Sequence, residues 1–162
     1  ILYSADHGEM LGDHNLMAKM NFYKSSVQVP ALIRPPKGMD GRVEDGLTES
    51  VDLTATILDI AGAEPLERSM GRSLLPFVDG KGASKEAAFS AIKNKNYPDR
   101  TYTMTTTERY RYTLESEPWT PCEFFDLQED PDEMNNLVND TSVQSLIKDM
   151  DKDFVKPYLG VS

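Results

Sequence analysis

The chain has 162 residues, which is enough for one ordinary domain, or one domain with a small appendage, around a real hydrophobic core. Its 27 acidic and 17 basic residues give a formal net charge of −10. This charge argues against a nucleic-acid-binding surface and against binding to an anionic membrane, because both depend on clustered positive charge. An anionic ligand would therefore have to be held at one local group of basic side chains.

The only cysteine, Cys122, excludes a disulfide within the chain and leaves the redox compartment open. We expect this cysteine to be a small, buried side chain beside a strand rather than a nucleophile. No apolar run in the sequence approaches the roughly 18 residues that a membrane span requires.

A short strand is predicted in residues 1–5, and it runs directly into the polar sequence DHGE. Open α/β sheets present their ligand-binding residues in this way, where a buried strand ends in a polar loop. A second apolar stretch, residues 25–36, has Pro30 inside it, which limits the predicted strand to a sheet edge or a bulge. Because the first residues resemble an interior strand, we expect the chain to be part of a longer protein.

The clearest predicted helix covers residues 48–62, with the sequence TESVDLTATILDIAG. Leu53, Ile57 and Ile60 recur three to four residues apart, so they fall on one face of the helix. Gly62 is a typical residue for the helix end, because glycine readily adopts the left-handed backbone conformation found there.

From residue 87 onward the pattern changes to β structure. Apolar and polar residues alternate in TYTMTTTERYRYTLES, residues 101–116, as they do in the two strands of a hairpin. Residues 122–127, CEFFDL, predict one more strand, and residues 141–160 carry an apolar stripe with helical spacing. We therefore expect residues 85–160 to form an antiparallel sheet covered by one amphipathic helix. The side chains expected in its core are Tyr112, Phe124, Leu146 and Ile147.

Five side chains that could bind a metal or take part in catalysis lie close together in the sequence near the start of the chain: Asp6, His7, Asp13, His14 and Lys19. The two histidines are the only ones in the sequence. Carboxylate and imidazole are common metal ligands, and a bound metal can polarise an ester oxygen. A lysine offers a compact positive charge to an oxyanion. Asp6 and His7 by themselves also fit a simple polar turn in which Gly8 has a positive φ.

Four segments of the chain, in the same order as in the family, resemble the sulfatases. YSADHGEMLGDHNLMAKMNFYKSSVQVPALIRPP, residues 3–36, resembles the family's metal-and-sulfate loop. VDLTATILDIAGAEP, residues 51–65, resembles a helix of the family, and MGRSLLPFVDGK, residues 70–81, resembles the turn that follows it. CEFFDLQEDPDEMNNL, residues 122–137, is similar to the family's C-terminal signature. One short motif would be weak, but four in order are highly specific.

The resemblance implies an α/β fold of the alkaline-phosphatase-like type. Residues 1–80 would be the C-terminal part of the catalytic α/β domain. Residues 81–162 would form a small α+β subdomain with an antiparallel sheet of about four strands and a packed terminal helix.

By position in the family's motif, the resemblance implies that Asp6 and His7 are metal ligands and that Lys19 contacts the sulfate group. His14 matches a position near the pocket and is, with Lys19, a candidate catalytic residue. The metal would be a divalent cation, Ca²⁺ in the first place, with Mn²⁺ or Zn²⁺ as alternatives because imidazole also suits softer metals. The family's Cys/Ser-x-Pro-x-Arg motif, whose first residue becomes the formylglycine nucleophile, does not occur in these 162 residues. We expect it in a preceding part of a longer protein.

The leading interpretation is therefore the C-terminal part of a metal-dependent sulfatase, completed by the rest of its own chain. Its substrate would be a sulfated small molecule or a sulfated carbohydrate, and we expect the 162 residues by themselves to be inactive. Phosphodiesterases and phosphonate monoester hydrolases share the Asp-His-Gly loop and are the nearest alternative. An alternative of another class is a non-catalytic binding or structural module, in which Asp6, His7 and Lys19 would not converge. The family occurs in several compartments, so the resemblance leaves the localisation open.

Overall fold

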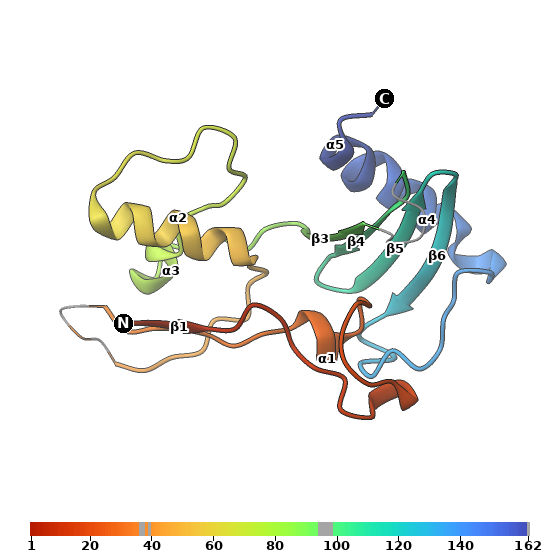
Figure 1. Cartoon of the computed structure of the whole chain (residues 1–162), viewed down its shortest axis with the longest axis horizontal. Coiled ribbons are helices and arrows are strands. Elements are labelled where there is room, and N and C mark those ends of the chain that lie inside the picture. The colour runs from red at the N-terminus through yellow and green to blue at the C-terminus, as the bar shows by residue number, and fades with distance from the viewer. Residues whose placement is uncertain (36–37, 39, 94–98, 162) are drawn as a thin grey trace. The chain divides into compact units, whose positions relative to one another are not determined.

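A computed structural model describes residues 1–35, 38, 40–93 and 99–161 of the chain (Figure 1). Contacts divide the chain into two compact units. One, called here the helical unit, consists of Ile1–Asp6 and Val29–Glu86. The other, the sheet unit, consists of His7–Gln28 and Ala87–Ser162.

The predicted division into residues 1–80 and 81–162 concerns the domains of a larger protein and stays a prediction. Within the chain, the contacts add a feature that the sequence did not suggest. Residues 7–28 belong with the sheet, although about 60 residues of the helical unit separate them from it in the sequence.

The helical unit contains two short strands, β1 (Leu2–Ser4) and β2 (Ala31–Ile33), which pair in antiparallel fashion with Leu2 opposite Ile33. The predicted second strand is shorter than expected. β2 begins only after Pro30, whose ring nitrogen has no hydrogen to donate to a ladder. Residues Lys24–Val27 form instead a single helical turn, α1, which belongs to the sheet unit.

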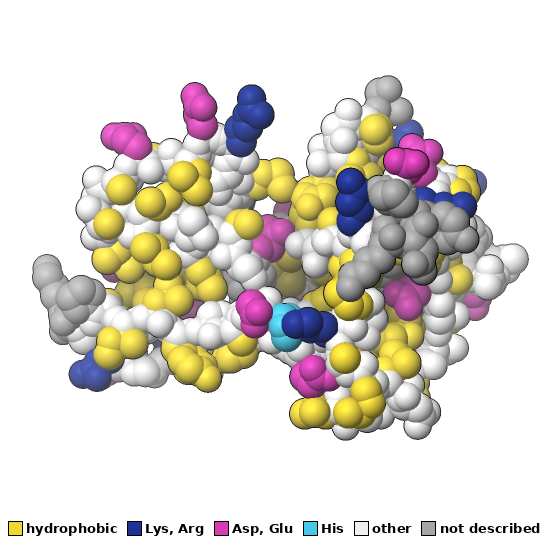
Figure 2. All heavy atoms as spheres, viewed as in Figure 1, with side chains coloured by type: hydrophobic (Ala, Val, Ile, Leu, Met, Phe, Trp, Pro, Cys, Tyr) yellow, Lys and Arg dark blue, Asp and Glu magenta, His cyan; other side chains and the backbone are white. Residues whose placement is uncertain are grey.

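The predicted helix is confirmed as α2 (Ser50–Ala61), and Gly62 ends it in the left-handed conformation with a φ of 64°. Its buried side chains are not the expected apolar ones. Ile57 and Ile60 are about half exposed, at 54% and 51%, and hydrophobic side chains are exposed over much of the face seen in Figure 2.

Asp52 and Thr56 are the fully buried residues of α2, because the side chains of both accept hydrogen bonds from backbone N–H groups of the segment that follows the helix. The Asp52 carboxylate accepts hydrogen bonds from the backbone N–H of Arg72 at 2.7 Å and from Lys85 Nζ at 2.7 Å. Thr56 Oγ1 accepts one from the backbone N–H of Leu74 at 2.8 Å, just before the short helix α3 (Leu75–Val78). These polar contacts fix the turn that resembles the sulfatase motif.

The sheet unit contains one four-stranded antiparallel sheet with the order β3-β4-β5-β6. Its strands are β3 (Ala88–Lys93), β4 (Thr101–Thr106), β5 (Tyr110–Ser116) and β6 (Trp119–Asp126). Tyr112 in β5 lies opposite Thr105 on one side and Phe124 on the other. The predicted hairpin and the additional strand are thus confirmed.

A nearly continuous helical segment covers one face of this sheet (Figure 1). It consists of α4 (Gln144–Met150), a π-helical turn (Asp151–Val155) and α5 (Lys156–Leu159). The core between helix and sheet contains Tyr112, Leu114, Phe124, Ile147, Met150 and Val155. The expected core is confirmed for Tyr112, Phe124 and Ile147, whereas Leu146 lies at its edge and is only partly buried.

The opposite face of the sheet is also buried. Successive strand residues point to opposite faces, so Arg111 and Phe125 lie on the side away from the helices. Arg111 donates a hydrogen bond to the carbonyl of Phe22, and the ring of Tyr23 lies 6.1 Å from that of Phe125. Residues 7–28 therefore pack against this second face, which is the feature that positions the candidate site.

The signature residues 122–137 comprise the end of β6 and the turn that follows it, and polar side chains of this segment build the turn. The Asp130 carboxylate accepts hydrogen bonds from the backbone N–H groups of Met134 and Asn135 at 3.0 and 2.8 Å. The Asn136 side chain accepts from the Phe124 N–H at 3.0 Å and donates to the Cys122 carbonyl at 3.1 Å. These two residues of the motif thus have a structural role.

No helix in the part of the chain that the structure describes is both long and apolar enough to cross a membrane.

Candidate functional site

The candidate site lies in the loop of residues 7–20, whose backbone is strained. Five non-glycine residues of this loop have positive φ values: Leu11, His14, Asn15, Ala18 and Met20. Each left-handed non-glycine residue costs roughly 1–2 kcal/mol, and such residues gather at functional sites where the surrounding structure holds them in place.

Backbone hydrogen bonds close this loop onto the segment that carries α1. The N–H of Gly8 donates to the Ser26 carbonyl at 2.8 Å, and the N–H of Met10 donates to the Ala18 carbonyl at 3.0 Å. A Cβ atom at Gly8 would overlap the Ser25 carbonyl oxygen. The glycine is therefore explained by this close approach and not by a positive φ, which it does not have.

The structure brings Lys19 and His7 together across 12 residues of sequence: Lys19 Nζ is hydrogen-bonded to His7 Nε2. His7 Nδ1 lies 2.7 Å from the carbonyl oxygen of Gly8, so Nδ1 carries the hydrogen and Nε2 has the lone pair. The side chain of Lys19 is exposed and that of His7 is half-buried. A cation and an imidazole lone pair thus face the same place in the loop.

His14 is held in another way. Its ring stacks on that of Tyr23 at a centroid distance of 3.9 Å and an angle of 15°. Burial raises the pKa of the Tyr23 phenol, and Glu123 raises it further, so the phenol is neutral at neutral pH. The neighbouring Asp13 accepts a hydrogen bond from the Ser25 hydroxyl. Both contacts tie the loop to the α1 segment.

Asp6 is exposed at the end of the helical unit, and His7 begins the sheet unit. The donor chemistry of His7 fits a metal, because a metal-binding imidazole generally donates its other N–H to a carbonyl or carboxylate, as His7 Nδ1 does to Gly8. Across residues 1–35, 38, 40–93 and 99–161, however, no three His, Cys, Asp or Glu side chains gather in a way that could hold a metal ion.

Sequence reasoning missed two residues beneath the loop, Arg111 and Glu133. They form a buried ion pair on the face of the sheet that residues 7–28 cover. Glu133 stands in the quoted signature motif, which was a signal for its importance but not for its partner. Arg111 carried no signal, because alternation in a hairpin does not distinguish a buried arginine from a solvated one.

Cys122 is partly buried in β6, and its thiol donates to the Thr120 carbonyl at 3.3 Å. Burial raises the pKa of this thiol, which keeps it protonated and disfavours a nucleophilic role.

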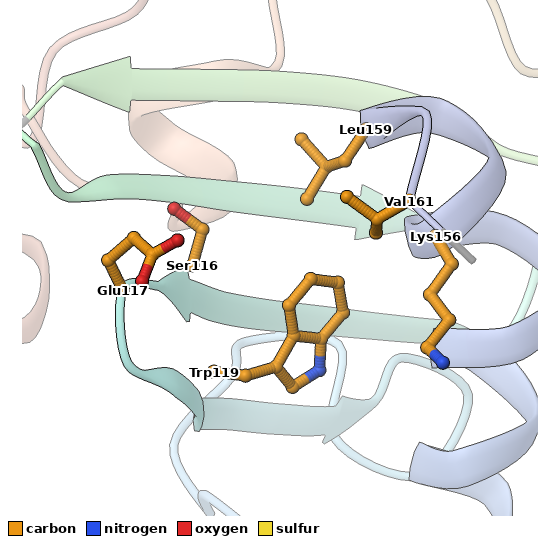
Figure 3. A pocket seen from close by; sticks show the side chains of 6 residues that line it. All are labelled: Ser116, Glu117, Trp119, Lys156, Leu159 and Val161. Atoms are coloured by element: carbon orange, nitrogen blue, oxygen red, sulfur yellow. The ribbon is translucent and has the colours of Figure 1, made fainter.

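A shallow pocket elsewhere in the sheet unit lies between the β5–β6 turn and α5. Figure 3 shows the Trp119 indole in it, with the side chains of Glu117 and Lys156 on either side in this view. The other lining residues are Ser116, Leu159 and Val161. The lining of this pocket contains no histidine and no cysteine.

Comparison with known proteins identifies the class. The sequence profile of the family described as "N-sulphoglucosamine sulphohydrolase, C-terminal" matches residues 12–157. The chain therefore belongs to this family, which is the C-terminal region of sulfatases in the alkaline-phosphatase-like superfamily.

Individual relatives agree with this assignment. The chain is 31% identical to arylsulfatase K of Gallus gallus over 159 residues, covering 91% of this chain and 30% of the relative. Its fold superimposes on the phosphonate monoester hydrolase of Agrobacterium radiobacter with a TM-score of 0.85 and 26% identity, covering 96% of this chain and 34% of that one.

A third relative was solved in complex with its substrate D-glucosamine-2-N,6-O-disulfate. Its TM-score is 0.78 and its identity 25%, and the match covers 94% of this chain and 34% of that one. The expected α/β fold, with an antiparallel sheet of four strands and a terminal helix, is thus confirmed. The chain spans about a third of the length of the relatives it matches.

Proposed function

We propose that the complete protein is a sulfatase that hydrolyses sulfate esters of a carbohydrate or another small molecule, and that this chain supplies one wall of its active site. The observation that carries the proposal is the contact between Lys19 and His7 in the strained loop. A structural module has no need of a lysine ammonium turned toward an imidazole lone pair. The description of the matching family and the sulfated substrate of the third relative support a sulfated sugar.

In this proposal Lys19 holds and neutralises an oxygen of the sulfate group, because its flexible, exposed ammonium can reach a ligand at the surface of the loop. The hydrogen bonds of the loop hold its strained backbone, and with it the base of the lysine side chain, in place before substrate binds, which lowers the cost of orientation. His14, stacked on Tyr23, fixes the loop next to it rather than taking part in proton transfer.

Asp6 and His7 would hold a divalent cation, Ca²⁺ or alternatively Mn²⁺ or Zn²⁺, together with ligands from other parts of the protein. The cation would polarise the ester, and a formylglycine outside these 162 residues would supply the nucleophile. In the present structure His7 Nε2 accepts a hydrogen bond from Lys19. A cation at Nε2 and the lysine ammonium would therefore compete for the same lone pair.

A second candidate function rests on the likeness to the phosphonate monoester hydrolase. A tetrahedral phosphonate presents the same oxyanions to Lys19 as a sulfate does, so the loop itself does not distinguish them. The test is to measure kcat/KM of the complete protein for 4-nitrophenyl sulfate and for 4-nitrophenyl phenylphosphonate, before and after metal chelation. Faster hydrolysis of the sulfate supports the first proposal, faster hydrolysis of the phosphonate supports the second, and turnover of neither refutes both.

A further inference from the structure

We propose that Arg111 and Glu133 act as a buried clamp that positions the loop carrying His7, His14 and Lys19. The two residues touch neither a ligand nor the reacting atoms; they act through the segment Phe22–Ser26. The catalytic consequence of the clamp rests on the proposed function, whereas its effect on the loop does not.

The clamp is a desolvated ion pair. Arg111 Nη1 donates to Glu133 Oε1, and the side chains are only 9% and 1% exposed. Burial lowers the pKa of the Arg111 guanidinium, while the attraction of Glu133 raises it, and an arginine remains charged in either case. A buried pair of this kind does not by itself make a protein more stable than packed hydrophobic residues would, so its presence calls for another reason.

That reason is visible in the backbone groups that the pair holds. Glu133 Oε2 accepts a hydrogen bond from the N–H of Lys24 at 2.6 Å, and Arg111 Nη1 donates to the carbonyl of Phe22 at 3.2 Å. Arg111 Nε is fixed in turn by the Thr106 hydroxyl in β4 at 3.1 Å. Two backbone atoms, on either side of Tyr23, are therefore attached to the sheet through charged groups, and such hydrogen bonds are stronger than neutral ones.

From this anchored segment, contacts lead directly to the candidate site. Tyr23 stacks on His14, the Ser25 hydroxyl binds Asp13, and the Ser26 carbonyl accepts from the N–H of Gly8, the residue after His7. The loop cannot hold its shape through its own preferences, because five of its residues have unfavourable positive φ values. Hydrophobic side chains at positions 111 and 133 could fill the space but could not bind the two backbone atoms.

The experiment compares hydrogen–deuterium exchange of the complete protein with that of its Glu133→Gln variant. The glutamine amide keeps the shape of the side chain. The carboxylate accepts hydrogen bonds from the Lys24 N–H and from Arg111 Nη1, whereas the amide presents an NH₂ group to one of these two donors. We expect peptides within residues 7–28 to exchange about 10- to 100-fold faster, while peptides of β4 to β6 keep their protection. The matched control is Asp126→Asn, which makes the same change in the exposed Arg109–Asp126 pair at the same end of the β5–β6 hairpin, and it should leave residues 7–28 unchanged.

Unchanged exchange in residues 7–28, or an equal loss of protection in the sheet in both Glu133→Gln and Arg111→Lys, overturns the clamp. If Glu133→Gln opens the sheet by destabilising it, the same exchange measurement on Arg111→Lys tests the clamp. Lysine keeps the charge but lacks the planar fork that reaches Phe22 and Thr106 together. On a sulfate ester, Glu133→Gln should lower kcat by up to about 100-fold with a much smaller change in KM. A protein without sulfatase activity would refute the proposed function, while the exchange result would still test the clamp.

Discussion

Replacing Lys19 by alanine tests the proposed site most directly. The side chain is exposed, and its described hydrogen bond is the one to His7 Nε2. Its loss removes no core packing, so the free energy of unfolding should change by less than about 0.5 kcal/mol and the melting temperature by less than about 2 °C. A donor to the developing charge of a transition state contributes far more, about 3–4 kcal/mol, which corresponds to roughly 100- to 1000-fold in kcat.

The assay is steady-state hydrolysis of 4-nitrophenyl sulfate by the complete protein, with thermal melts of each variant. We expect kcat and kcat/KM to fall together in Lys19→Ala, because the interaction is strongest in the transition state. Lys148→Ala, on the exposed side of α4, is the matched control and should retain activity. Metal affinity should stay the same or rise in Lys19→Ala, because the ammonium no longer competes for His7 Nε2.

Two results would refute this reasoning. A Lys19→Ala variant with near-normal kcat would show that the lysine is an ordinary surface residue. A variant that loses activity only because its melting temperature collapses would show that the lysine stabilises the loop and does not bind sulfate.

Three further predictions concern the loop, the core and the metal. Gly8→Ala should displace the Ser25 carbonyl, break the hydrogen bond from the amide of residue 8 to the Ser26 carbonyl and abolish most activity. The readout is lost protection of the amide of residue 8 in hydrogen exchange. Ile147 lies in the core of the sheet unit, so Ile147→Ala should lower the free energy of unfolding, measured by urea titration, by about 2–5 kcal/mol. The control Ser145→Ala, on the exposed side of α4, should change it by less than about 0.5 kcal/mol. The isolated 162 residues should hydrolyse no aryl sulfate. They should bind Ca²⁺ or Mn²⁺ only weakly in calorimetry, because two ligands seldom hold a divalent ion. Chelator-sensitive turnover by the isolated chain would contradict this prediction.

Local patterns in the sequence were sufficient for much of the architecture. The alternation in residues 101–116 and the apolar stripe in residues 141–160 correctly predicted the hairpin and the terminal helix. Both periods follow from the geometry of strand and helix, and the burial of Tyr112, Phe124 and Ile147 follows from them. The stretch from Asp6 to Lys19 was also recognisable, since it gathers both histidines and matches a known loop.

The same reasoning failed where burial depended on partners far away in the sequence. The apolar spacing in α2 suggested Ile57 and Ile60 as an inward face, yet Asp52 and Thr56 are the buried residues because they bind backbone groups near residues 72–74. Residues 25–27 looked like part of a strand, but together with Lys24 they form a helical turn whose first N–H, that of Lys24, is bound by Glu133.

The sequence by itself determined the family, the sheet and its covering helix. It also determined which residues of the first loop are candidates for metal binding or catalysis. Only the tertiary structure decided that Lys19 meets His7 and that the loop rests on Arg111 and Glu133. The physical reason is the range of the contacts. The hydrogen bonds of the clamp join residues 89 and 109 positions apart, and no local pattern of hydrophobicity or charge specifies a partner at that distance.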